Sequence, residues 1–100
     1  MISVVNFVEL DNRVVSATYR NLMVKARVVL VEKTSGTQVS DAVVTIASPM
    51  PTGSLRIRLP ESIRSGTYFL MALNVHGDYL AKSADFQVTE ERHRVTTSLS

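Results

Sequence analysis

Apolar and polar residues alternate along most of this chain, in short runs that are separated by turn-forming residues. Alternation with a period of two predicts β-strands with one side facing a core. A helix over residues 22–32 is the competing interpretation, but the run from Val28 to Val31 is rich in β-branched residues and is poor helix material. The alternating runs cover residues 2–10, 13–19, 22–32, 42–47 and 54–59, with a shorter one at Val39.

A hairpin over residues 65–88 organises the rest of the chain. Its first strand opens at Gly66 and is apolar on both parities, which predicts a strand that is buried on both faces or central in its sheet. Residues 74–78 supply a turn, since Gly77 can take the positive φ that a tight hairpin needs. The return strand, over residues 79–88, is more polar and is expected at a sheet edge. The predicted core residues are Val28, Leu30, Leu55, Ile57, Tyr68, Leu70, Ala72 and Phe86.

Glycine and proline mark the predicted turns. Residues 48–53 contain two prolines and are predicted to be a loop across one end of a β-sandwich. Short strands punctuated at this rhythm favour a sandwich over βαβ units. We expect one all-β domain over residues 1–89 and a charged, then Ser/Thr-rich, tail over residues 90–100. All four glycines are placed in turns: Gly36, Gly53, Gly66 and Gly77.

One part of the chain, residues 55–88, carries a family resemblance. A short strand ends at Pro60, then come Ser-Gly-Thr-Tyr, a hydrophobic strand, a His-Gly-Asp turn and Phe-x-Val. This order resembles the last three strands of immunoglobulin-like domains, and is similar to the early-set sandwiches that end galactose-oxidase-type enzymes and to bacterial immunoglobulin-like repeats. The resemblance implies an immunoglobulin-like antiparallel sandwich of about seven to eight strands.

The resemblance also implies a role for one residue. In that family a Tyr at the position of Tyr68 often forms a corner hydrogen bond back to the preceding loop. The disulfide and buried Trp of antibody domains are missing here, as is the copper-binding His of the oxidase domain. No catalytic role therefore carries over.

Composition narrows the function classes. The 100 residues suffice for one core without disulfides, and the absence of cysteine removes thiol chemistry and thiolate metal sites. A net charge of +2, with basic residues spread along the chain, disfavours binding to nucleic acid through phosphates. No run approaches the ~20 apolar residues of a membrane span. The N-terminus lacks the basic leader and cleavage site of a signal peptide.

Patterns for catalysis or metal binding are missing from the sequence. His76 lies in the predicted hairpin turn, and His93 lies between two arginines, which disfavour a bound cation. We find no metal-ligand spacing, calcium loop, glycine-rich phosphate loop or Gly-x-Ser-x-Gly motif. We therefore expect no cofactor and no enzymatic activity.

These observations predict a non-catalytic structural or protein-interaction module. The expected role is a subunit of a larger assembly, such as a phage capsid-decorating or tail protein or a surface-layer domain, which would place it at a virion or cell surface. Association is expected through the terminal strands, over residues 2–10 and 94–99, by strand addition to an open edge. The alternative is a ligand-binding accessory domain for polysaccharide or another anionic polymer.

Four cations form a candidate patch for an anionic partner. In the immunoglobulin-like order their two strands are the second and fifth, which are neighbours in one sheet, so the cations would lie ~5–8 Å apart across strands. Such a cluster needs interleaved acids, for which Glu9 or Glu32 are available, or an acidic surface of protein, glycan or nucleic acid. The alternative is a solvated face that prevents aggregation. The candidate residues are Lys25, Arg27, Arg56 and Arg58.

Overall fold

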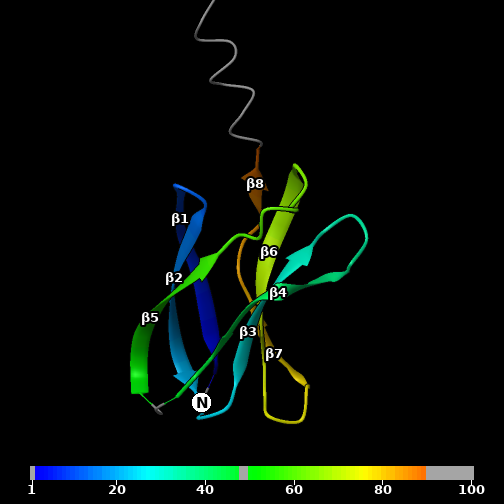
Figure 1. Ribbon diagram of the computed structural model, residues 1–100. Helices are drawn as coiled ribbons and strands as arrows, with labels where there is room; N and C mark the ends of the chain where they lie inside the picture. The colour runs from blue at the N-terminus through cyan, green and yellow to red at the C-terminus, as the bar shows by residue number, and fades with distance from the viewer. Residues whose placement is uncertain (1, 48–49, 90–100) are drawn as a thin grey trace, which may run out of the picture.

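The structure is a computed structural model that describes residues 2–47 and 50–89, and it consists of two antiparallel β-sheets packed face to face (Figure 1). The predicted all-β sandwich is therefore confirmed. The predicted tail over residues 90–100 lies outside the described residues. The strands are β1 (Val4–Asp11), β2 (Val14–Leu22), β3 (Arg27–Glu32), β4 (Gln38–Thr45), β5 (Met50–Arg58), β6 (Gly66–Leu73), β7 (Tyr79–Lys82) and β8 (Phe86–Val88).

The two sheets differ in size. One has the order β1-β2-β5, with β2 in the centre. The other has the order β4-β3-β6-β7, and β8 pairs with β6 as well. All of these pairings are antiparallel. In Figure 1 the smaller sheet lies to the left and the larger sheet to the right.

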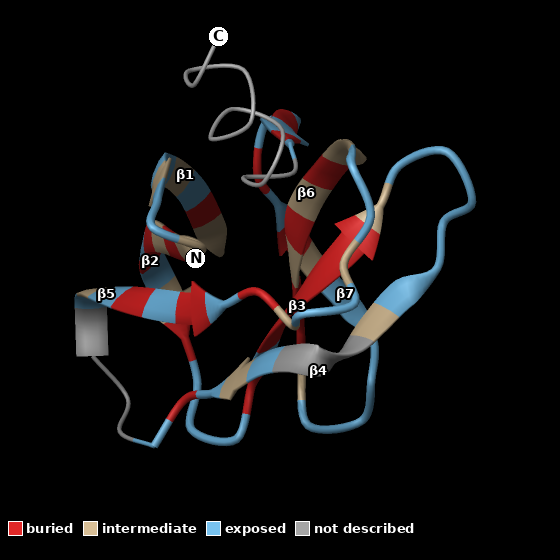
Figure 2. Ribbon diagram, turned by 45° about the horizontal axis from the view of Figure 1, so that its top comes forward, coloured by how far each residue is buried: buried red, intermediate tan, exposed pale blue. Residues whose placement is uncertain are grey.

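The core fills the space between the inward rows of the two sheets. Figure 2 shows buried residues alternating with more exposed ones along β5 and β6. The rings of Phe7 and Phe86 stack with their centroids 4.2 Å apart, which joins β1 to β8 across the sandwich. All eight predicted core residues are buried in this one cluster: Val28, Leu30, Leu55, Ile57, Tyr68, Leu70, Ala72 and Phe86.

The predicted central hairpin is confirmed in its first strand and its turn. Strand β6 is central, with β3 on one side and β7 and β8 on the other. In the turn, Asn74 Oδ1 accepts hydrogen bonds from the backbone N–H groups of His76 and Asp78, both at 2.9 Å. Gly77 has a φ of 89°, a left-handed conformation that glycine adopts without strain.

The return strand is not continuous, contrary to the expectation from alternation. It is divided into β7 and β8, and the buried parity changes between Ser83 and Phe86. The cause is a short interruption in which the Ser83 side chain replaces a strand partner. The Leu70 N–H donates to Ser83 Oγ at 2.9 Å, and the Ser83 N–H donates to the Leu70 carbonyl at 2.8 Å.

Residues 22–32 do not form one strand, so that prediction was wrong. Strand β2 continues to Leu22, and β3 begins only at Arg27. Between them the chain crosses from the smaller to the larger sheet through a turn in which Lys25 has a φ of 72°. The Lys25 N–H donates to the Ile46 carbonyl at 2.8 Å, which holds the crossing in place.

Strand β5 begins earlier than expected, at Met50, so Gly53 lies inside a strand and not in a loop. Proline lacks an N–H donor but is tolerated in an edge strand, and β5 pairs with β2 alone among the described strands. Gly53 lies opposite Tyr19 in this pairing. Pro51 therefore lies in an edge strand, whereas Pro49 lies outside the described residues.

Candidate interaction surfaces

The structure separates the four cations of the candidate patch. Arg27 begins β3 in the larger sheet, and Lys25 lies in the turn before it. Arg56 and Arg58 lie on β5 in the smaller sheet. The prediction that their strands are neighbours in one sheet was wrong, because the crossover at residues 23–26 was read as part of a strand. Only Arg56 and Arg58 stay together, on the outward side of β5.

The outer face of the smaller sheet has charge of opposite sign at its two edges. Glu9 and Asp11 are exposed on β1, and we call them the acidic edge. Arg56 and Arg58 are exposed on β5, and we call them the basic edge. On β2, which lies between the two edges, the residues paired with these charged residues are the neutral Ser16 and Val14.

The charged residues of the two edges lie in the same rows across the sheet. Ser16 on β2 pairs with Glu9 on one side and with Arg56 on the other. Because neighbouring strands lie ~4.8 Å apart, Glu9 and Arg56 of one molecule are separated by about 10 Å at Cα. Within the described residues neither acidic side chain forms an ion pair with these arginines. Val14 joins Asp11 and Arg58 in the same way.

Short polar side chains leave two shallow hollows between the edges. The larger, of about 610 Å³, adjoins the charged rows, and the smaller, of about 380 Å³, adjoins Arg20. Thr18 and Ser54 line both, so the hollows are adjacent. Their hydroxyl groups can donate and accept hydrogen bonds. The larger hollow is lined by Val8, Glu9, Ser16, Ala17, Thr18, Ser54, Leu55 and Arg56.

The larger sheet has apolar side chains on the side away from the core, and we call these residues the apolar outer face. Because an outer face of an antiparallel sheet is normally polar, this is unusual. At its borders Val43 pairs with Val29, and Tyr79 pairs with Leu73; Val43 is 41% and Tyr79 59% exposed. The apolar outer face consists of Val29, Val31, Phe69, Met71 and Leu73, which form a hydrophobic cluster separate from the main core. Val29, Val31 and Leu73 are themselves buried, so Phe69 and Met71 supply the partly exposed surface of this cluster.

Cations flank the apolar outer face. The Lys82 ammonium lies 5.4 Å from the centroid of the Phe69 ring, a cation–π contact. Arg27 has the same parity as Val29 and Val31 on β3, and its side chain is exposed. This face therefore combines apolar side chains with positive charge at its borders.

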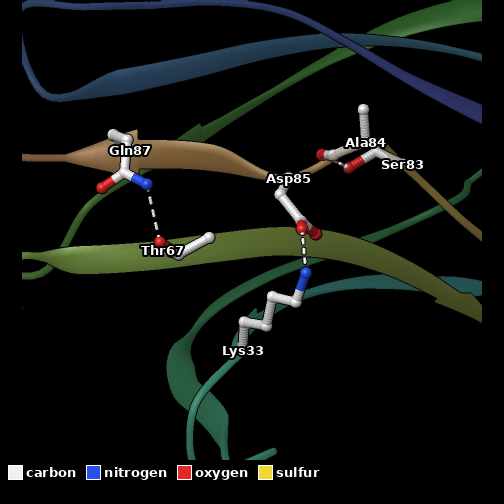
Figure 3. Close-up of polar contacts among 6 residues, drawn as sticks. All are labelled: Lys33, Thr67, Ser83, Ala84, Asp85 and Gln87. Atoms are coloured by element: carbon white, nitrogen blue, oxygen red, sulfur yellow. Dashed lines mark hydrogen bonds and ion pairs between the residues drawn. The ribbon is translucent and has the colours of Figure 1, made fainter.

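Polar contacts close the sheet near β8, as Figure 3 shows. Lys33, in the turn after β3, forms an ion pair with Asp85 in the link between β7 and β8. Gln87 Nε2 donates to Thr67 Oγ1 at 2.6 Å, which joins β8 to β6. The Lys33–Asp85 pair is exposed to solvent, so its contribution to stability is small.

Tyr68 forms the corner hydrogen bond that the resemblance implied. Its hydroxyl donates to the Arg64 carbonyl at 2.9 Å, four residues earlier in the chain. Burial raises the pKa of the Tyr68 phenol above its ordinary value of 10.0, and the nearby Glu32 carboxylate raises it further. The geometry gives Tyr68 a structural role.

His76 lies exposed in the β6–β7 turn, as predicted, and His93 lies outside the described residues. Across residues 2–47 and 50–89 no group of three or more His, Cys, Asp or Glu side chains is placed to hold a metal ion. The same residues contain no helix that could cross a bilayer. Comparison of the chain with protein-family models, curated proteins and solved structures finds no match.

The sequence did not predict the charged edges of the smaller sheet or the apolar outer face of the larger sheet. For the apolar outer face, however, the sequence carried a signal. Residues 28–31 and 66–75 are apolar on both parities, and for residues 66–75 this was interpreted as a strand buried on both faces or central in its sheet. This is confirmed for β6, which is central in its sheet, with Leu73 of the second parity buried and Phe69 and Met71 half-buried in the smaller cluster. What the sequence did not show is that this cluster lies on the side of the sheet away from the main core. The matched rows of charge had no signal in the sequence, since they depend on strand pairing between residues far apart in the chain.

Proposed function

We propose that this chain is a non-catalytic structural or protein-interaction module of immunoglobulin-like type, acting as a subunit of a larger assembly. Two features support the type. The first, second and fifth strands share one sheet and the third and sixth share the other, as in immunoglobulin-like sandwiches. The hydrogen bond from Tyr68 to Arg64 supports it as well, since such a corner is typical of that fold.

The apolar outer face is the observation that carries the interaction role. Exposed apolar side chains gathered on one face favour contact with protein, because their burial releases about 25 cal/mol per Å². Phe69 and Met71 are only half-buried, and Val43 and Tyr79 extend the surface with exposed apolar atoms. A second protein surface laid on this sheet would bury all four.

The kind of assembly is proposed from fold-level analogy. A small sandwich with one apolar outer face and open edges suits a repeated unit in a shell, such as a capsid-decorating or tail protein of a phage, or a surface-layer domain. The proposed location is accordingly a virion or a cell surface. Of the two terminal segments that are predicted to associate, the structure describes the first, which contains β1.

Size-exclusion chromatography with light scattering, over a series of concentrations, tests this function. We expect the wild type to associate, and Val43→Lys with Tyr79→Lys to give a lower mass at the same concentration. Met23→Lys is the matched control, since Met23 is 68% exposed in the turn before β3 and not on the apolar outer face. A wild type that stays monomeric throughout contradicts the proposal.

The second candidate function is a ligand-binding accessory domain for polysaccharide or another anionic polymer. It is favoured by the polar hollow on the smaller sheet, where the hydroxyl groups of Thr18 and Ser54 lie beside Arg56. Binding there would use hydrogen bonds and one ion pair, and not stacking on an aromatic ring. A glycan array with wild type and Arg56→Glu tests it. Clear binding to acidic glycans by a strict monomer, lost in the variant, would favour this function over assembly.

A further inference from the structure

We propose that copies of this chain join head to tail through the smaller sheet, with β1 of one copy adding in parallel to β5 of the next. This inference rests on the proposed assembly function and names its contact and its partner, a second copy of the chain. The contact matches the acidic edge of one copy with the basic edge of the other.

Both strands have an open side in the described structure. Strand β1, with eight residues, pairs with β2 alone, and β5, with nine residues, also pairs with β2 alone. Each therefore presents a row of backbone N–H and C=O groups without strand partners. Such a row is a template for pairing with another chain.

The direction of the two strands permits pairing by translation. Strands β1 and β5 are each antiparallel to β2, so they are parallel to one another. If a second copy keeps the orientation of the first and is shifted sideways in the plane of the sheet, its β1 lies alongside β5 of the first copy. The two strands then run parallel. The contact is heterologous, because different surfaces of the two copies meet.

The register then pairs the charges of both rows at once. In one copy a row runs Glu9, Ser16, Arg56, and translation places Glu9 of the next copy beside Arg56 at a spacing of ~4.8 Å. In the neighbouring row, which runs Asp11, Val14, Arg58, the same shift places Asp11 beside Arg58. Opposite charges directly across neighbouring strands are favourable.

The uncharged rows are compatible with the same register. Asn6, Thr18 and Ser54 form one row, so Asn6 of the next copy lies beside Ser54, where their side chains can hydrogen-bond. The bulge between Phe7 and Glu9 interrupts the ladder locally, but it leaves the rows on both sides of it in step.

Two-fold pairings do not match the charges. If β5 paired with β5, the two arginines of each copy would face neutral residues or the arginines of the other copy. If β1 paired with β1, Glu9 and Asp11 would face neutral residues or the acidic residues of the other copy. Only the pairing of unlike edges places acid beside base along both rows. Because sheets twist, repeated pairing would curve into a ring or a helical filament. The apolar outer face lies on the other sheet and stays free for lateral contacts.

The test uses two charge variants, alone and mixed. The first carries Glu9→Arg and Asp11→Arg, and the second carries Arg56→Glu and Arg58→Glu. Each alone opposes like charges at the contact, so we expect its self-association in low salt to fall by about tenfold or more. An equimolar mixture restores complementary charges at every contact, and we expect association to return to within about threefold of the wild type.

A control with Lys25→Glu and Arg64→Glu makes the same change in net charge as the second variant, at exposed loop positions, and should associate like the wild type. Sedimentation velocity gives the association, and circular dichroism confirms the fold. If a reversal fails to fold, Glu9→Gln with Asp11→Asn is used instead and should also weaken association. If the edge variants associate as strongly as the wild type, edge pairing is overturned. It is also overturned if the variants fold and their mixture stays monomeric. In both cases the assembly function stands. A wild type monomeric at every concentration overturns both.

Discussion

The ring of Tyr19 lies against Gly53 across the β2–β5 pair, so close that a Cβ on Gly53 would come within 2.5 Å of Tyr19 Cζ and Oη. A glycine weakens an edge strand because it has no side chain to pack, and an aromatic ring from the neighbouring strand compensates by covering it. The pair therefore anchors the first half of β5 to the sheet, and it fixes the position of an edge that the proposed assembly uses.

The first prediction concerns this contact. Gly53→Ala should lower the free energy of unfolding by about 1–3 kcal/mol, since the added methyl group displaces a ring packed in the core. Denaturation in urea measures the loss, and Ser54→Ala, one residue along on the exposed side, should change stability little. In a Tyr19→Leu background the alanine should cost less, because the ring is gone. The same cost in both backgrounds would contradict the account.

The second prediction concerns the corner hydrogen bond. Tyr68→Phe should lower the free energy of unfolding by about 0.5–1.5 kcal/mol at neutral pH, since the Arg64 carbonyl loses its donor. Tyr79→Phe, at an exposed residue, is the control and should cost little. A cost as small as that of the control would show that the corner contributes nothing to stability.

The third prediction follows from the raised pKa of Tyr68. Because the folded state holds the phenol proton more tightly than the unfolded state, stability falls as pH rises from 10.0 through the raised pKa. The advantage of the wild type over Tyr68→Phe should therefore shrink above pH 10.0 and stay constant below it. Paired denaturation curves at several pH values measure it. An advantage that grows with pH would mean that the pKa is lowered.

The fourth prediction concerns Ser83, whose side chain fills the interruption between β7 and β8. Ser83→Ala should cost about 1–3 kcal/mol, because the buried Leu70 N–H loses its acceptor. Hydrogen exchange at the Leu70 amide should accelerate in this variant. Unchanged exchange at Leu70 would show that another group accepts this hydrogen bond.

The fifth prediction compares the two faces of β6. Leu70→Ala should cost about 2–5 kcal/mol, because Leu70 is fully buried in the main core. Met71→Ala removes a half-buried side chain from the apolar outer face and should cost less in the monomer. Chemical denaturation at low protein concentration compares them. A larger loss of stability for Met71→Ala than for Leu70→Ala would show that the inner and outer faces of β6 are assigned the wrong way round.

Local alternation was sufficient to predict the inner rows of β3, β5 and β6. Leu55, Ile57 and Leu70 are buried because every second side chain of a strand points to the same side. The Asn74–Asp78 turn was predictable for a similar reason, since its contacts lie within five residues of chain.

Strand pairing and breaks were not predictable in the same way. Nothing local shows that the chain changes sheets at residues 23–26, because Lys25 continues the alternation while its backbone turns to a positive φ. Arg27 was consequently placed beside Arg56 and lies instead in the other sheet. Gly53 resembles a turn residue until its partner Tyr19 is known. The charged edges depend on two such pairings and were missed for that reason.

The most direct test of assembly is the mass of the wild-type protein in solution as a function of concentration. The account predicts that sedimentation in low salt gives a mass that rises with concentration above the 11.0 kDa of one chain. Added salt should weaken the part of the rise that comes from the charged edges and leave the part that comes from the apolar outer face. A mass that stays at 11.0 kDa at every concentration, in low and high salt alike, would contradict it.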